Sequence, residues 1–131
     1  GRVAGGSLPH ARYINIPVLN RKEPIETYKG PANSIPIRVS DDLDENRKNR
    51  IVPKATFFMT ISEQPNDLQI RCNGIPLSYE FTYLQDENAD TGQYLLKGIL
   101  PDGSLRTGQN EFVVSGQSLS VYDLWIDLDY E

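Results

Sequence analysis

Apolar and polar residues alternate along much of this 131-residue chain, in short runs that are separated by turn signals. Because successive side chains of a strand point to opposite faces, this alternation predicts half-buried strands. The runs cover residues 13–19, 34–40, 54–61, 67–72, 79–84, 92–100, 110–116 and 118–130. Short strands without a helix-sized periodic segment predict an all-β fold, a jelly-roll type β-sandwich of about eight antiparallel strands.

The same alternation predicts which side chains face the core. The expected inward rows are Ile14, Ile16 and Val18; Ile35, Ile37 and Val39; Ala55, Phe57, Met59 and Ile61; Leu68, Ile70 and Cys72; and every second residue from Tyr122 to Tyr130. Pro17 and Pro36 each interrupt a run. Because proline cannot donate a ladder hydrogen bond, we expect both of these strands to lie at a sheet edge or to be bulged.

Turn chemistry and one helical segment complete the expected elements. Residues 40–50 predict one short helical turn, capped by Ser40 or Asp41, with Asp44 and Lys48 at helical spacing. Turns are expected at Asn73-Gly74, at residues 91–92 and at residues 101–103, because Gly and Asn tolerate positive φ.

The length fits one domain. We expect a flexible arm or linker at residues 1–12 and a single β-sandwich domain at residues 13–131. The linker-like opening favours a domain of a longer exported chain, which would place it outside the cell or in the periplasm. No apolar stretch approaches the length of a membrane span, so no membrane association is expected.

Charge and residue counts exclude several classes of function. The formal net charge is −5, with 13 Lys and Arg against 18 Asp and Glu, which argues against nucleic acid as a partner. His10 is the single histidine and Cys72 the single cysteine, so a catalytic triad, a disulfide and a thiolate metal cage are not expected. The carboxylates of Asp123, Asp127 and Asp129 on one strand face are interpreted as solvated surface, and no enzyme activity is predicted.

Residues 85–92 contain one candidate cation site. Asp86, Asn88 and Asp90 occupy alternate positions, as calcium ligands do in a calcium-binding loop. The pattern then fails, because Thr91 stands where such a loop has glycine and Lys97 where it has glutamate. A polar hairpin turn is therefore the default interpretation, with a structural calcium as the alternative; no other cofactor is expected.

Trp125, the single tryptophan, falls on the acidic side of the last predicted strand, between Asp123 and Asp127. Its ring has three possible environments. It can be a platform for an external ligand, it can pack against the N-terminal arm or a neighbouring domain, or a bulge near Val121 can turn it inward.

Three segments carry a resemblance to a known family. "LQIRCNGIPL", "SLRTGQNEFVV" with Leu105, Gly108 and Asn110, and "SVYDLWIDLDY" occur in this order. Together they resemble galactose-binding-like jelly rolls, as in the non-catalytic ancillary or carbohydrate-binding domains that follow the catalytic barrel in bacterial glycoside hydrolases. The resemblance implies an ancillary domain of a carbohydrate-active enzyme, with the catalytic domain of the same chain as a partner.

The leading hypothesis is a carbohydrate-binding module that tethers a linked glycoside hydrolase to a polysaccharide or oligosaccharide. In this hypothesis a sugar stacks on Trp125, and Asp123 or Asp127, with Tyr83 or Arg71, bonds its hydroxyls. The alternative is a structural domain that docks on the catalytic barrel through the Trp125 face and binds no sugar. An adhesion or protein-interaction sandwich comes third, because the aspartates interrupt any large apolar patch on this face.

Overall fold

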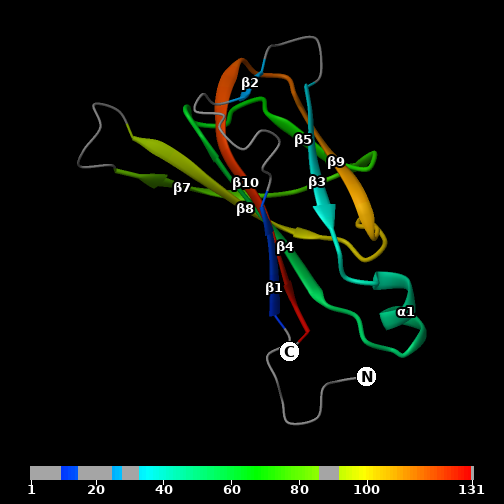
Figure 1. Ribbon diagram of the computed structural model, residues 1–131. Helices are drawn as coiled ribbons and strands as arrows, with labels where there is room; N and C mark the ends of the chain where they lie inside the picture. The colour runs from blue at the N-terminus through cyan, green and yellow to red at the C-terminus, as the bar shows by residue number, and fades with distance from the viewer. Residues whose placement is uncertain (1–9, 15–24, 28–32, 86–91, 131) are drawn as a thin grey trace.

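The computed structural model describes residues 10–14, 25–27, 33–85 and 92–130, which form an antiparallel β-sandwich with one short helix (Figure 1). Sheet A has the strand order β1-β10-β4-β8-β7, and β2 also pairs with β10. Its strands are β1 (His10–Ile14), β2 (Ile25–Thr27), β4 (Lys54–Ile61), β7 (Glu80–Leu84), β8 (Gln93–Leu100) and β10 (Leu119–Asp129). Sheet B has the order β3-β9-β5-β6, with β3 (Asn33–Val39), β9 (Gly108–Ser115), β5 (Gln69–Cys72) and β6 (Ile75–Pro76). The predicted all-β sandwich is confirmed.

The core lies between the two sheets and contains the predicted inward rows of residues 35–39, 55–61 and 68–72. Phe57 of sheet A meets Phe112 of sheet B with 5.9 Å between ring centroids, and both side chains are fully buried. Burial of one such side chain stabilises the fold by about 1.5–3 kcal/mol. The predicted rows of β3, β4 and β5 are all buried: Ile35, Ile37, Val39, Ala55, Phe57, Met59, Ile61, Leu68, Ile70 and Cys72.

The inward row of β10 differs from the prediction at its start. Leu124, Ile126 and Leu128 are buried as expected, but Tyr122 is exposed and Val121 is buried. The pairing of β10 with β4 shifts register between Val121 and Asp123, which is a β-bulge. The extra residue reverses the alternation, so side chains before the bulge follow the opposite parity from those after it.

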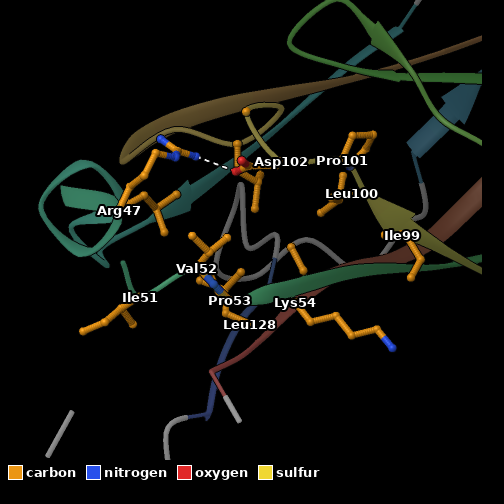
Figure 2. A pocket seen from close by; sticks show the side chains of 14 residues that line it. Arg47, Ile51, Val52, Pro53, Lys54, Ile99, Leu100, Pro101, Asp102 and Leu128 are labelled. Carbon is orange, nitrogen blue, oxygen red and sulfur yellow. Dashed lines mark hydrogen bonds and ion pairs between the residues drawn. The ribbon is translucent and has the colours of Figure 1, made fainter. Parts of the chain in front are cut away.

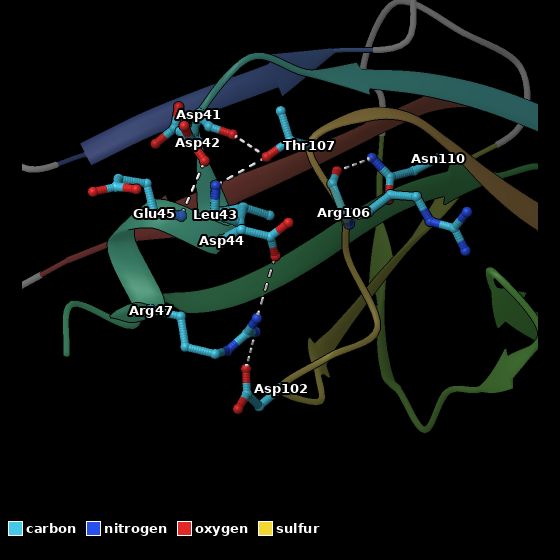
Figure 3. Close-up of polar contacts among 10 residues, drawn as sticks. All are labelled: Asp41, Asp42, Leu43, Asp44, Glu45, Arg47, Asp102, Arg106, Thr107 and Asn110. Atoms are coloured by element: carbon cyan, nitrogen blue, oxygen red, sulfur yellow. Dashed lines mark hydrogen bonds and ion pairs between the residues drawn. The ribbon is translucent and has the colours of Figure 1, made fainter. Parts of the chain in front are cut away.

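The predicted helical turn is α1 (Leu43–Lys48), and its cap differs from the expected residues. The N-cap is Asp42, whose carboxylate accepts a hydrogen bond from the Glu45 amide at 3.0 Å (Figure 3). Asp41 has another role, because its carboxylate accepts hydrogen bonds from the hydroxyls of Tyr13 and Tyr130. α1 is also the single helix of the described residues, and it is too short and too polar to cross a membrane.

Asn73 and Gly74 form the predicted two-residue hairpin turn between β5 and β6, with φ angles of 50° and 86°. The turn is tied to the loop before β9 by Asn110, whose side chain is fully buried. The Asn110 amide oxygen accepts from the Asn73 side chain at 2.8 Å and from the Arg106 amide at 2.9 Å. Its amide nitrogen donates to the carbonyls of Arg106 and Gly108. Asn73, Gly108 and Asn110, three of the residues that carried the resemblance, therefore belong to one polar network.

The remaining expectations concern the chain ends and the prolines. β1 begins at His10, so residues 10–12, which the sequence places in an arm, belong to a strand of sheet A. Pro36 lies on β3 at the edge of sheet B, as predicted. Pro17, Ile16 and Val18 lie outside the described residues.

Candidate functional site

Four side chains form a column across the outer face of sheet A, which we call the aromatic column: Arg12 of β1, Trp125 of β10, Phe58 of β4 and Lys97 of β8. Trp125 is the cross-strand partner of Phe58, and Phe58 is the partner of Lys97. The two rings stack with centroids 5.1 Å apart and planes at 12°. The Arg12 guanidinium carbon lies 5.7 Å from the indole centroid, and the Lys97 ammonium 5.8 Å from the Phe58 centroid. A cation therefore flanks each end of the ring stack.

The two faces of the indole are occupied from opposite sides of β10. Phe58 comes from β4, and Arg12 comes from β1, the strand on the other side of β10. Arg12 is held there by Asp127, whose carboxylate accepts bonds of 2.7 and 3.0 Å from the Arg12 Nε and Nη2 atoms. This pairing raises the pKa of Arg12. Trp125 thus packs against the N-terminal strand, one of the environments considered for it.

Polar groups surround the indole. Asp123 is exposed, and its carboxylate accepts a hydrogen bond of 2.9 Å from the Thr60 hydroxyl. The indole Nε1 atom is buried and has no hydrogen-bond acceptor among the described residues. Buried donors are ordinarily paired, so this atom is an exception. The structure therefore brings Trp125, Asp123 and Asp127 together on one face of sheet A.

Tyr83 and Arg71 lie away from this face. Tyr83 of β7 is the partner of Tyr94, which has the same parity on β8 as the buried Leu96, so Tyr83 points to the opposite side of sheet A from Trp125. Its ring lies 5.1 Å from that of Tyr94, and its hydroxyl donates to the Gln85 side chain at 3.0 Å. Arg71 is exposed on β5 in the other sheet. The predicted ligand-binding set therefore divides among three surfaces.

The candidate calcium residues Asp86, Asn88 and Asp90 lie outside the described residues. Among the residues that the structure does describe, no group of three or more His, Cys, Asp or Glu side chains is placed to hold a metal ion.

An apolar cleft of about 220 Å³, which the sequence patterns did not predict, lies at the end of the sandwich beside α1 (Figure 2). Val52 and Ile99 line it and are 51% and 55% exposed, unusually high for large apolar side chains. Arg47 and Asp102, also lining residues, form an ion pair of 2.7 Å. Two sequence signals pointed here: the apolar run of residues 51–53 just before β4, and an isoleucine at an outward position of β8.

The comparisons with known proteins show the fold. No family model matches the chain, and no curated protein matches its sequence. A solved structure that matches is a β-porphyranase of glycoside hydrolase family 86 from the human gut bacterium Bacteroides plebeius. The TM-score is 0.59 with 11% sequence identity, and the match covers 92% of this chain but 20% of the porphyranase chain. The chain thus has the fold of a region of a glycoside hydrolase and spans about a fifth of that protein's length.

Proposed function

We propose that this chain is a non-catalytic accessory domain of an exported glycoside hydrolase-type protein, and that it docks on another domain of the same protein. The observation that carries the proposal is the apolar cleft, where Val52 and Ile99 are more than half exposed. Exposed apolar surface at a concave site is typical of an interface. The occupant is a domain of the same protein, because a region with this fold makes up a fifth of a longer enzyme chain.

The covered indole supports docking over sugar stacking. A sugar ring that binds an aromatic platform needs one open ring face. Phe58 and Arg12 occupy both faces of Trp125, and Asp127 holds Arg12 in place. Sugar stacking would first require Arg12 to leave the indole.

The docking proposal is tested in the longer protein that carries this chain. Val52→Asp and Ile99→Asp should separate its thermal unfolding into independent transitions or lower the midpoint of the neighbouring domain, because a charge would be buried at the interface. In the isolated 131-residue chain both variants should keep the wild-type midpoint. Tyr122→Asp is the matched control, since Tyr122 is an exposed large side chain on β10 outside the cleft. If neither cleft variant changes the thermal unfolding of the longer protein, docking at this site is contradicted.

Carbohydrate binding is the second candidate, and the surroundings of Trp125 favour it. Asp123 and Asp127 flank the indole on one sheet face, and the indole Nε1 has no acceptor among the described residues. A sugar hydroxyl is a suitable acceptor for this donor once the atoms that cover it move aside. Such a domain would act by tethering, which raises the local concentration of the linked enzyme at its substrate.

Affinity electrophoresis through gels that contain soluble plant and algal polysaccharides tests this candidate. Retardation of the chain by one polymer, lost in Trp125→Ala and Asp123→Ala but retained in Arg71→Ala, would support binding on the outer face of sheet A. If no polymer slows the chain relative to an inert protein of similar size, docking remains as the proposed function.

A further inference from the structure

Strand β7 is an unprotected edge of sheet A. Its one neighbour among the described strands is β8, and all five of its residues are exposed. Natural edge strands are ordinarily protected by proline, by charged side chains (lysine above all) or by very short length, because their open backbone groups can pair with other chains. The other edges show these devices: β3 contains Pro36, β6 has two residues and ends at Pro76, and β1 contains Arg12. β7, with the sequence EFTYL, has no proline and no cation, and its one charged residue, Glu80, lies at its first position.

Two of the exposed side chains of β7, Phe81 and Tyr83, are aromatic and are held in position by β8. Phe81 and Tyr83 are 44% and 50% exposed and point to the same face of the strand. Both rings pack on Tyr94 of β8, with centroid distances of 6.1 and 5.1 Å. The hairpin of β7 and β8 extends away from the rest of the sandwich in Figure 1. A new strand can therefore approach β7 without displacing any described element.

We propose that β7 pairs in antiparallel orientation with β7 of a second copy of this chain, about a two-fold axis at Thr82. This register pairs the whole of both strands. It places Phe81 opposite the second copy's Tyr83, and Tyr83 opposite the second copy's Phe81, so the aromatic surfaces of the two hairpins become continuous. Glu80, the single charged residue of β7, then lies opposite Leu84 of the second copy and not opposite the second copy's Glu80. A two-fold interface must be self-complementary, and these cross-strand pairs meet that condition.

The size and charge of the interface set its strength. Two paired five-residue strands bury less than the roughly 1,200 Å² of a stable interface. We therefore expect a monomer–dimer equilibrium with a dissociation constant of about 10–100 µM. Each copy has a formal net charge of −5. Added salt screens the repulsion between copies, so the dimer should become tighter as ionic strength rises. An interface of salt bridges would weaken instead.

Sedimentation of the 131-residue chain over a range of concentrations tests the association. The mass should rise from the 14.8 kDa of the monomer toward twice that value. Tyr83→Lys should weaken the dimer at least tenfold, because it places a cation on the pairing edge. Ile99→Lys is the matched control, since Ile99 is equally apolar and exposed but lies in the cleft, and its dimer should be unchanged.

Cysteine cross-linking tests the register. Thr82→Cys places the two equivalent cysteines opposite each other at the two-fold axis, so it should form a disulfide-linked dimer on oxidation. Leu84→Cys should not, because in this register the two equivalent cysteines lie too far apart to bond. The native Cys72 is buried and does not interfere. A chain that stays monomeric at millimolar concentration overturns the proposal. So does a dimer that Tyr83→Lys leaves intact, or one that Ile99→Lys disrupts.

Discussion

The indole of Trp125 lies nearly parallel to the phenyl ring of Phe58, its cross-strand partner, with 5.1 Å between the ring centroids. Stacked aromatic pairs contribute about 0.5–1.5 kcal/mol beyond the area that they bury. Arg12 and Lys97 extend this pair into a column that crosses β1, β10, β4 and β8. The column therefore links the strands of sheet A on the side away from the core.

Replacement of Trp125 by alanine should destabilise the fold. We expect Trp125→Ala to lower the free energy of unfolding by about 2 kcal/mol, less than for a fully buried tryptophan because the ring is half-buried. In a double-mutant cycle with Phe58→Ala, the coupling energy should be about 1 kcal/mol. Urea unfolding measures both values. A Trp125→Ala variant with wild-type stability would contradict a stabilising role for the stack of Trp125 and Phe58.

The cover of Trp125 by Arg12 can be measured by fluorescence, because Trp125 is the single tryptophan. Arg12→Gln removes both the bidentate bond to Asp127 and the cation over the indole. The indole should become more accessible, so acrylamide should quench its emission more strongly than in the wild type. Arg71→Gln, on the other sheet, is the control and should leave quenching unchanged. Equal quenching in Arg12→Gln would show that the guanidinium does not cover the ring in solution.

The sequence predicted most of the sheet but less of the site, for physical reasons. Strand 54–61 has the predicted bounds and inward row because one of its faces packs in the core, and the apolar residues of that face recur at every second position; Thr60, on the other face, is buried as well. Alternation gives no sign of a bulge, so the parity of Val121 and Tyr122 was wrong. The packing of Arg12 on Trp125 depends on which strands are neighbours, and a local pattern does not contain that information.

The same reasoning separates the predicted binding residues. Tyr83 and Arg71 have suitable chemistry and lie on strands, as expected. Their distance from Trp125 follows from the order of strands within and between the sheets, which periodicity cannot supply. The Asn73-Gly74 turn was recognisable in advance, because its positive φ angles are a local backbone requirement. The bond from Asn73 to Asn110 joins residues far apart in the sequence, so the turn signal does not predict it.

Asn110 should be a major determinant of stability. Its buried side chain makes four hydrogen bonds, to Asn73, Gly108 and both backbone groups of Arg106. Asn110→Ala would leave several of these groups buried without a partner, at a cost of about 3 kcal/mol in unfolding free energy. Asn49→Ala, at an exposed position after α1, is the control and should change stability little. Chemical denaturation measures the free energy of unfolding of both variants. A small loss in Asn110→Ala would mean that the hydrogen bonds of this side chain are not needed, because water takes their place.

Cys72 should be unreactive in the folded chain. Burial raises the pKa of its thiol to about 12, so little thiolate exists at neutral pH. A thiol reagent such as Ellman's reagent should react slowly with the native chain. After unfolding in guanidinium it should react rapidly, with one equivalent of thiol per chain. The labelling rate should follow the population of unfolded chain across a denaturant series. Fast labelling under native conditions would place the sulfur at the surface.

Stability should fall at high pH through the two tyrosines that bond Asp41. Burial and the bond to Asp41 raise the pKa of both Tyr13 and Tyr130 above its ordinary value. The folded chain therefore holds these protons more tightly than the unfolded chain. Their contribution to stability is complete below about pH 10, the unfolded value, and is lost as pH rises through the folded values.

Urea unfolding at about pH 9 and pH 11 measures this loss. The wild type should lose more stability over this interval than Tyr130→Phe, which keeps the ring but has no hydroxyl to titrate. The reason is that ionisation of Tyr130 places a phenolate against the carboxylate of Asp41, at the contact that joins β10 to the start of α1. Tyr122→Phe removes an exposed hydroxyl from β10, the strand that Tyr130 directly follows, and should behave as the wild type does. If Tyr130→Phe and the wild type lose equal stability, the tyrosine pair does not control the alkaline limit of this fold.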